Sequence, residues 1–177
     1  ELSLAVTATG RTITLADTGE NVELAADQTG TVTFAAATTT NTTNSVSLTT
    51  TAARAINILS FTDYATVTLD SSDGAMTFGG ATFSGDQLAT VILTGDNAID
   101  FGAAVISNTT TDAAAVVVNA SAMTAAVDLD MGGGAGEAET FIGGSGVDTI
   151  TLTADSDSGD AYSVTTNAGA DVVSVNL

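Results

Sequence analysis

The chain has 177 residues, enough for one domain or two small ones with a real hydrophobic core. It carries 21 acidic and only two basic side chains, and this formal net charge of −19 excludes binding to nucleic acids and to anionic membrane surfaces. Cys is absent, which excludes disulfides and thiol chemistry, and no apolar run is long enough for membrane insertion.

Alternation of polar and apolar residues with a period of two recurs along almost the whole chain and predicts β-strands. In chain order, the predicted strands are 2–6, 12–15, 21–24, 31–34, 45–48, 55–61, 66–69, 76–78, 81–83, 87–93, 99–101, 115–118, 127–131, 149–152, 162–164 and 172–175. Turn-forming residues separate them, and the Thr/Asn-rich stretch 38–44 is predicted to be an exposed loop. Gly79-Gly80, between two short strands, predicts a β-hairpin.

Helical periodicity is missing, since no segment keeps apolar residues at three-to-four spacing for three turns. Hydrophobic residues make up 44% of the chain, but aromatic residues only 5%, and Trp is absent. Small side chains suit a thin, layered core between sheets. The sequence therefore predicts an all-β fold, either a β-solenoid or β-roll, or a slim β-sandwich.

One stretch carries recognisable chemistry: residues 143–151 read Gly-Gly-Ser-Gly-Val-Asp-Thr-Ile-Thr. Glycines permit tight turns that expose backbone carbonyls, and an aspartate offers the hard oxygen ligands that calcium prefers. Ile150 then begins a short strand and is expected to point inward. This order is the nonapeptide pattern of calcium-bound parallel β-rolls.

The pattern resembles the repeats of the RTX (repeats-in-toxin) family of secreted bacterial proteins, and the Thr/Ala/Asp/Gly-rich composition resembles its surface-layer-like members. A degraded copy follows at 166–173, and a third, with one extra residue and Glu in place of Asp, lies at 133–141. In the family, successive copies stack and share ions between adjacent turns. Because the copy at 166 starts 23 residues after the one at 143, regular stacking of these two copies is not expected.

The resemblance implies a calcium-binding β-roll region over 126–177, following a Thr/Ala-rich all-β region over 1–125, or one continuous domain. The predicted Ca²⁺ ligands are Asp148 and Asp171, with carbonyls of Gly144, Gly146 and Asn167. A second candidate set comprises Asp155, Asp157 and Asp160. Asp128 and Asp130 share one strand face and either bind an ion or face water.

Catalysis is not expected, because His and Cys are absent and both cations are arginines, Arg11 and Arg54. Paired carboxylates could hydrolyse glycosides, but no Trp is present to form a sugar platform. The predicted class is therefore a non-enzyme.

The resemblance and the charge together predict an extracellular, cell-surface structural subunit that folds with Ca²⁺ and self-assembles into a surface layer or filament. With no Pro and no Lys to protect sheet edges, strand edges could pair between subunits. A cell-surface polysaccharide is a further possible partner. Two alternatives stay open: an adhesin or stalk module of a larger surface protein, and an ice-binding solenoid. The latter is suggested by Thr-x-Thr pairs beginning at Thr12, Thr31, Thr66 and Thr149.

Overall fold

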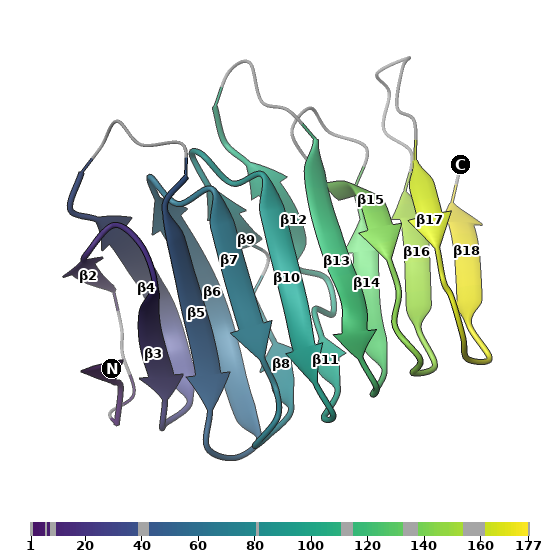
Figure 1. Cartoon of the computed structure of the whole chain (residues 1–177), viewed down its shortest axis with the longest axis horizontal. Coiled ribbons are helices and arrows are strands. Elements are labelled where there is room, and N and C mark those ends of the chain that lie inside the picture. The colour runs from purple at the N-terminus through teal and green to yellow at the C-terminus, as the bar shows by residue number, and fades with distance from the viewer. Residues whose placement is uncertain are drawn as a thin grey trace.

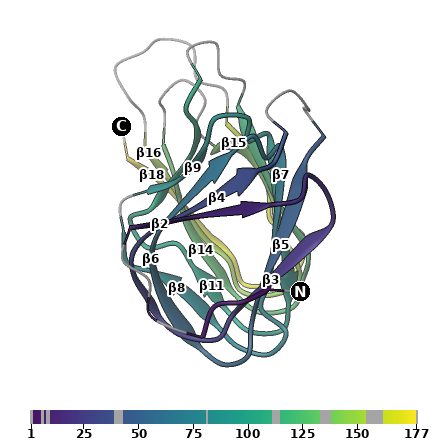
Figure 2. The ribbon, with the colours of Figure 1, turned by 90° about the vertical axis from the view of Figure 1, so that its left-hand side faces the viewer.

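The protein folds into a β-solenoid, in which the chain winds in successive coils around one interior (Figures 1 and 2). The structure, a computed structural model, describes residues 2–5, 7, 10–38, 43–80, 82–110, 115–132, 138–153 and 162–176. These residues form no helix, and thus none that is long and apolar enough to cross a membrane.

Eighteen strands are formed by the described residues. They are β1 (Leu2–Ser3), β2 (Arg11–Leu15), β3 (Glu20–Leu24), β4 (Gln28–Ala36), β5 (Ser45–Thr50), β6 (Arg54–Thr62), β7 (Thr66–Asp70), β8 (Met76–Phe78), β9 (Thr82–Gly85), β10 (Thr90–Gly95), β11 (Ile99–Asp100), β12 (Val105–Asn108), β13 (Val116–Met123), β14 (Val127–Met131), β15 (Ala138–Ile142), β16 (Thr149–Thr153), β17 (Ser163–Thr165) and β18 (Val172–Asn176).

Two parallel sheets enclose the interior. Sheet A has eight strands in the order β1-β3-β5-β7-β10-β13-β15-β17 and faces the viewer in Figure 1. Sheet B has ten strands and contains the second strand, or pair of strands, of each coil. All strand pairings in the described residues are parallel, with strands of one coil bonded to those of the next. The predicted all-β solenoid is therefore confirmed, and the alternative sandwich is not formed.

The length of one coil corrects the prediction about the two glycine-rich copies. Thr66 pairs with Thr90, and Thr149 pairs with Val172, so one circuit takes 24 and 23 residues at these places. The 23-residue offset between the copies at 143 and 166 is therefore one full coil. The two copies stack directly, which is the opposite of the prediction.

The hairpin predicted at Gly79-Gly80 is also wrong. The strands β8 and β9 on either side do not pair with each other; both pair in parallel with the long strand β6. Gly-Gly here bends the chain so that two short strands cover successive parts of one longer neighbour. A glycine pair indicates a sharp bend, and here the chain continues around the same coil after the bend instead of reversing to form a hairpin.

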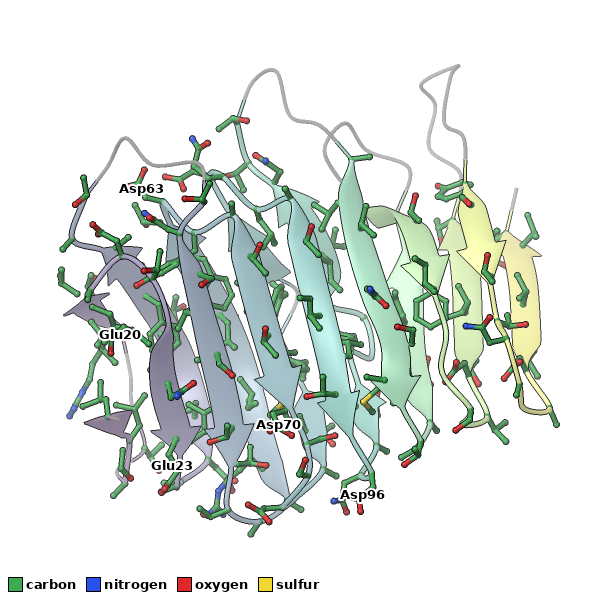
Figure 3. The ribbon with its side chains drawn as sticks, in the orientation of Figure 1. Glu20, Glu23, Asp63, Asp70 and Asp96 are labelled. Atoms are coloured by element: carbon green, nitrogen blue, oxygen red, sulfur yellow. The ribbon has the colours of Figure 1, made fainter. Side chains whose placement is uncertain are left out.

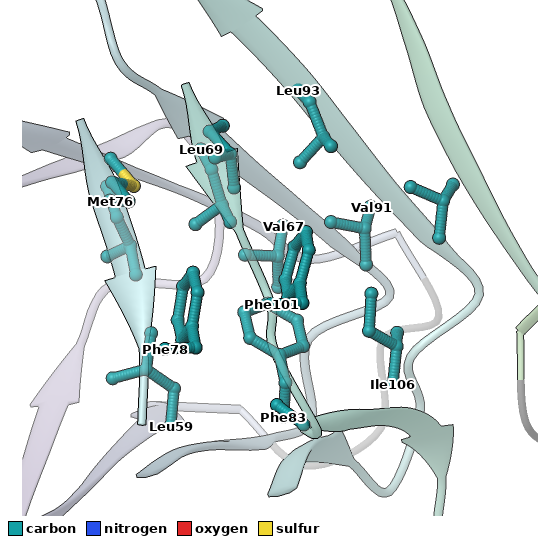
Figure 4. Close-up of a cluster of buried hydrophobic side chains, with 14 of the residues drawn as sticks. Leu59, Val67, Leu69, Met76, Phe78, Phe83, Val91, Leu93, Phe101 and Ile106 are labelled. Atoms are coloured by element: carbon teal, nitrogen blue, oxygen red, sulfur yellow. The ribbon is translucent and has the colours of Figure 1, made fainter. Parts of the chain in front are cut away.

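The interior is filled by apolar side chains that stack from coil to coil. All six Phe side chains are buried, and five of them contact one another in a continuous row. Figure 4 shows three of these five, Phe78, Phe83 and Phe101. Phe34 lies on Phe61 with ring centroids 5.8 Å apart, and Phe78 lies on Phe101 at 4.9 Å. The few aromatic residues are thus concentrated where they contribute the most buried area per side chain.

Several glycines lie where the backbones of adjacent coils approach most closely. A Cβ at Gly80 would be 2.1 Å from the Asn57 carbonyl oxygen of the preceding coil, whereas a Cβ at Gly79 would meet nothing within 4 Å. A Cβ at Gly74 would be 2.1 Å from the Ala52 carbonyl carbon. These contacts are with backbone atoms that cannot move aside without separating the coils.

We therefore expect opposite results from two neighbouring substitutions. Gly80→Ala forces coils apart and should lower the free energy of unfolding by about 1–3 kcal/mol, the usual cost of overpacking. Gly79→Ala should be neutral or stabilise by up to about 1 kcal/mol, because it restricts only the unfolded chain. Chemical denaturation measures both, and equal effects would contradict the close-approach argument.

Candidate functional site

The predicted calcium ligands meet at one corner of the solenoid, which we call the C-terminal corner. It consists of residues 143–148, which join β15 to β16, and residues 166–171, which join β17 to β18. All five predicted ligands Asp148, Asp171, Gly144, Gly146 and Asn167 belong to it. Two adjacent coils therefore bring together residues that are one circuit apart in the sequence.

The first half of the corner is fastened to the coil before it. Asp148 Oδ1 accepts the Val127 N–H at 3.0 Å, and the Met123 carbonyl accepts the Ser145 N–H at 3.0 Å. A Cβ at Gly144 would lie 2.1 Å from the Met123 oxygen, and one at Gly146 would lie 2.1 Å from the Ala125 oxygen. Glycine is needed at both positions because the backbones touch.

The same arrangement repeats toward the last coil. Asp171 Oδ1 accepts the Asp148 N–H at 2.9 Å, as Asp148 does for Val127. The Gly144 carbonyl accepts the Ala168 N–H at 3.2 Å, and the Gly143 carbonyl accepts the Asn167 side-chain amide at 2.6 Å. Asn167 has φ 58°, a left-handed conformation that Asn tolerates better than most residues.

Asp148 is the most unusual group of the corner, because its carboxylate is fully buried. Its Oδ2 atom has no hydrogen-bond partner. A Cβ built on Gly143 would lie 2.6 Å from this oxygen and 2.7 Å from the Thr166 carbonyl oxygen, so both oxygens border the space beside Gly143. Burial raises the pKa of Asp148; hydrogen bonds from the Val127 and Gly144 amides lower it, and nearby Asp171 raises it further.

These contacts fit a bound cation only in part. Asp148 Oδ2 and the Thr166 carbonyl supply two hard oxygens, whereas Asp148 Oδ1, Asp171 Oδ1 and the Gly144 carbonyl already accept backbone amides of a neighbouring coil. Calcium takes six to eight oxygens. Within the part of the chain that the structure describes, no three acidic, His or Cys side chains are grouped as a metal site. The second predicted set, Asp155, Asp157 and Asp160, lies outside the described residues, as does most of the copy at 133–141.

Asp128 and Asp130 lie outside the corner, on the outer face of β14. Asp128 is paired in register with Asp100 of β11, a residue that sequence analysis did not single out. Partial burial raises the pKa of Asp128, and the charges of Asp100 and Asp130 raise it further. Asp130 accepts a hydrogen bond from the Thr153 hydroxyl at 2.9 Å. This acidic row is separate from the buried carboxylate of Asp148.

Aspartates join consecutive coils at other corners as well. Asp27 Oδ1 accepts the Ala55 N–H at 3.1 Å, and Asp17 Oδ1 accepts the Thr38 N–H at 2.7 Å. Arg54 plays the complementary part, since its guanidinium donates to the Leu24 carbonyl at 3.1 Å and the Ala25 carbonyl at 2.6 Å. Sequence analysis missed these roles. The signal that could have revealed them is an aspartate in a turn that lies about one coil length away in the sequence from the residue whose N–H it accepts.

The Thr-x-Thr pairs do not form one array. The pairs at Thr12, Thr31 and Thr149 belong to strands of sheet B, and the pair at Thr66 belongs to β7 of sheet A. Among the threonines of these four pairs, only Thr12 and Thr33 are in register with each other in adjacent coils.

No family model, no curated protein and no solved structure matches this chain. The interpretation of the corner therefore depends on its own geometry.

Asp63 is a second buried carboxylate. Its side chain is 8% exposed, its φ is 61°, and its N–H donates to Asp86 Oδ1 at 2.6 Å. Burial raises the pKa of Asp63 above 3.8, and the Asp86 charge raises it further. A raised folded-state pKa means that the ionised form destabilises the fold and that protonation relieves this cost.

We therefore expect Asp63→Asn to raise the melting temperature near neutral pH, since Asn keeps the left-handed conformation and removes the buried charge. The advantage should shrink as the pH falls through the raised pKa and disappear below about pH 3.8, where wild-type Asp63 is protonated too. Thermal melts across this range measure it. The exposed Asp73→Asn is the control, and an equal gain in it would contradict the assignment to Asp63.

Proposed function

We propose that the protein is an extracellular structural subunit that assembles end to end through its open terminal coils, with Ca²⁺ bound at the C-terminal corner. The observation that carries this proposal is the position of the exposed large apolar side chains. In the described residues they are Leu2, Val147, Val172, Val173 and Val175. Four of these five belong to the terminal strands β1 and β18.

The last coil explains why two of these valines, Val173 and Val175, are exposed. Val173 pairs with Ile150, and Val175 with Leu152, so both occupy inward positions of the solenoid. Ile150 is fully buried under the last coil, whereas Val173 is 44% and Val175 57% exposed because no further coil covers them. Covering each would contribute about 1 kcal/mol, since each is roughly half exposed.

The edge strands at the two ends of the solenoid could also form backbone hydrogen bonds with another subunit. β17 and β18 end the two sheets on one side, and β1 and β2 lie at the other end of the solenoid (Figure 1). A strand at a sheet edge presents unpaired N–H and C=O groups that pair readily with another strand. Joining the tail of one subunit to the head of the next is a heterologous contact, which propagates as a fibre when it does not close.

Calcium enters the proposal through charge. A chain with net charge −19 repels itself in a compact state, and cations bound at acidic turns relieve that repulsion. At the C-terminal corner, Asp148 Oδ2 and the Thr166 carbonyl would hold the ion beside Asp171. When bound, the ion supplies a positive charge at a buried carboxylate, and its binding free energy adds to the folding free energy. Secretion into a calcium-rich exterior, as the RTX resemblance implies, agrees with this dependence.

The adhesin or stalk module is the alternative that uses the same observation. In that case the open edges are covered by further coils of one longer polypeptide, and purified protein stays as monodisperse rods. A surface polysaccharide would then be a partner of the whole molecule.

We expect Ca²⁺ to raise the melting temperature and chelation to lower it. Asp148→Asn should abolish most of this difference, because the amide keeps an oxygen for the Val127 N–H but has no charge to attract the ion. The exposed Asp96→Asn should keep the full difference. Circular dichroism melts with and without a chelator measure this. Identical melts of wild-type protein under both conditions would refute the role of calcium.

Elongation is tested separately. Val173→Glu places a charge at an inward position of the last coil. We expect wild-type protein to form fibres in electron micrographs taken with calcium, and the Val173→Glu variant to form shorter fibres or none. Val172→Glu is the matched control, because Val172 lies on the same strand and is 50% exposed but pairs with the outward-facing Thr149. Wild-type particles that never exceed one solenoid in length would contradict end-to-end assembly.

A further inference from the structure

The outer face of sheet A carries two long columns of side chains. One column runs Ser45, Thr66, Thr90, Val117, Thr140 and Ser163, each in register with the next. The second runs Asn21, Ser47, Thr68, Ile92, Asn119, Ile142 and Thr165. Since neighbouring strands of a sheet are ~4.8 Å apart, the columns form a regular array.

None of these 13 side chains is charged, although the chain has 21 acidic residues. Among the acidic residues labelled in Figure 3, Glu23 and Asp70 belong to the next column of the same sheet, and Asp96 follows the end of β10. The outer face of sheet B differs, since Asp100, Asp128 and Asp130 project from its strands. A third column on the outer face of sheet A does carry charge, since it runs Ser3, Glu23, Thr49, Asp70, Thr94 and Ala122. We therefore call only the 13 side chains of the first two columns the uncharged face of sheet A.

The centre of this uncharged face is also its most apolar part. Ile92, Val117 and Ile142 come from the three consecutive coils β10, β13 and β15, and each is partly exposed on the outer side. Hydroxyl-bearing residues surround them, among them Thr68, Thr90 and Thr140. An apolar centre with a polar rim is the usual composition of a protein interface.

We propose that the uncharged face of sheet A binds the same face of a second copy of this chain, side by side. Two copies with net charge −19 repel each other, and contact through these 13 side chains keeps the carboxylates of Glu23 and Asp70 at its border rather than within it. The contact is self-complementary, so a twofold axis closes it into a pair. It adds a lateral contact to the end-to-end contact proposed above and does not depend on it.

The size of the face sets the strength of the pairing. Eight strands at ~4.8 Å spacing, with two or three outward positions each, give a face of about 35 by 15 Å. Pairing would cover roughly 500 Å² on each copy and about 1,000 Å² in total, which is the lower limit for a specific interface. A single pair is therefore weak, and repetition of the contact along joined subunits strengthens it.

Small-angle X-ray scattering tests the inference, because rod cross-section reports lateral pairing and rod length reports end-to-end joining. We expect the cross-section of wild-type protein to double as its concentration rises. Thr68→Glu should keep it single, since two charges would face each other, and Thr33→Glu should leave the doubling intact. Thr33 is the matched control: it is also an outward-facing, partly exposed Thr within a strand, but in sheet B.

A second variant guards against misfolding. Ile92→Thr suits a β-strand but removes apolar area from the centre of the face, and we expect it to weaken pairing while the far-ultraviolet spectrum stays unchanged. A cross-section that stays single for wild-type protein at every concentration, or that responds equally to Thr68→Glu and Thr33→Glu, would overturn the inference. So would a single cross-section combined with ice binding that Thr68→Glu alone abolishes, which would assign the face to ice.

Discussion

Contact between the backbones of successive coils is the interaction on which this structure depends. Parallel hydrogen bonds join each strand to its equivalent in the next coil, and the corners repeat the contact with glycines that leave no room for a Cβ. Each coil is held chiefly by the coils before and after it, as in other quasi-one-dimensional folds. Within the described residues, the first and the last coil therefore each have a neighbouring coil on one side only.

Aspartate takes part in this stacking in a way that changes how the acidic composition should be understood. Asp27, Asp148 and Asp171 each accept a backbone N–H from a neighbouring coil, so their carboxylates serve as acceptors in the ladder. A cation at the C-terminal corner would have to share atoms with these hydrogen bonds. Asp148 Oδ2 is buried and accepts no hydrogen bond, so a cation could bind it without displacing a backbone N–H.

The proposed end-to-end assembly uses the same coil-on-coil burial of apolar side chains that stabilises the fold. Val173 and Val175 occupy inward positions that a further coil would bury, whether that coil belongs to a second subunit or to a longer chain. The uncharged face of sheet A provides the other direction of contact. Charge distinguishes this face from the part of sheet B where Asp100, Asp128 and Asp130 project, since those carboxylates would repel a second copy.

The sequence by itself determined the all-β class and most of the strands, because alternation with period two is a local property that each stretch carries independently. It also located the C-terminal corner through the Gly and Asp spacing at 143–148. It did not predict β12 or β15. Only the tertiary structure decided which strands pair. Alternation is the same in parallel and antiparallel sheets, so Gly79-Gly80 predicted a hairpin where the chain bends onward, and Asp148 and Asp171 were not expected to stack. Their 23-residue separation becomes one coil only when long-range backbone hydrogen bonds fix the register.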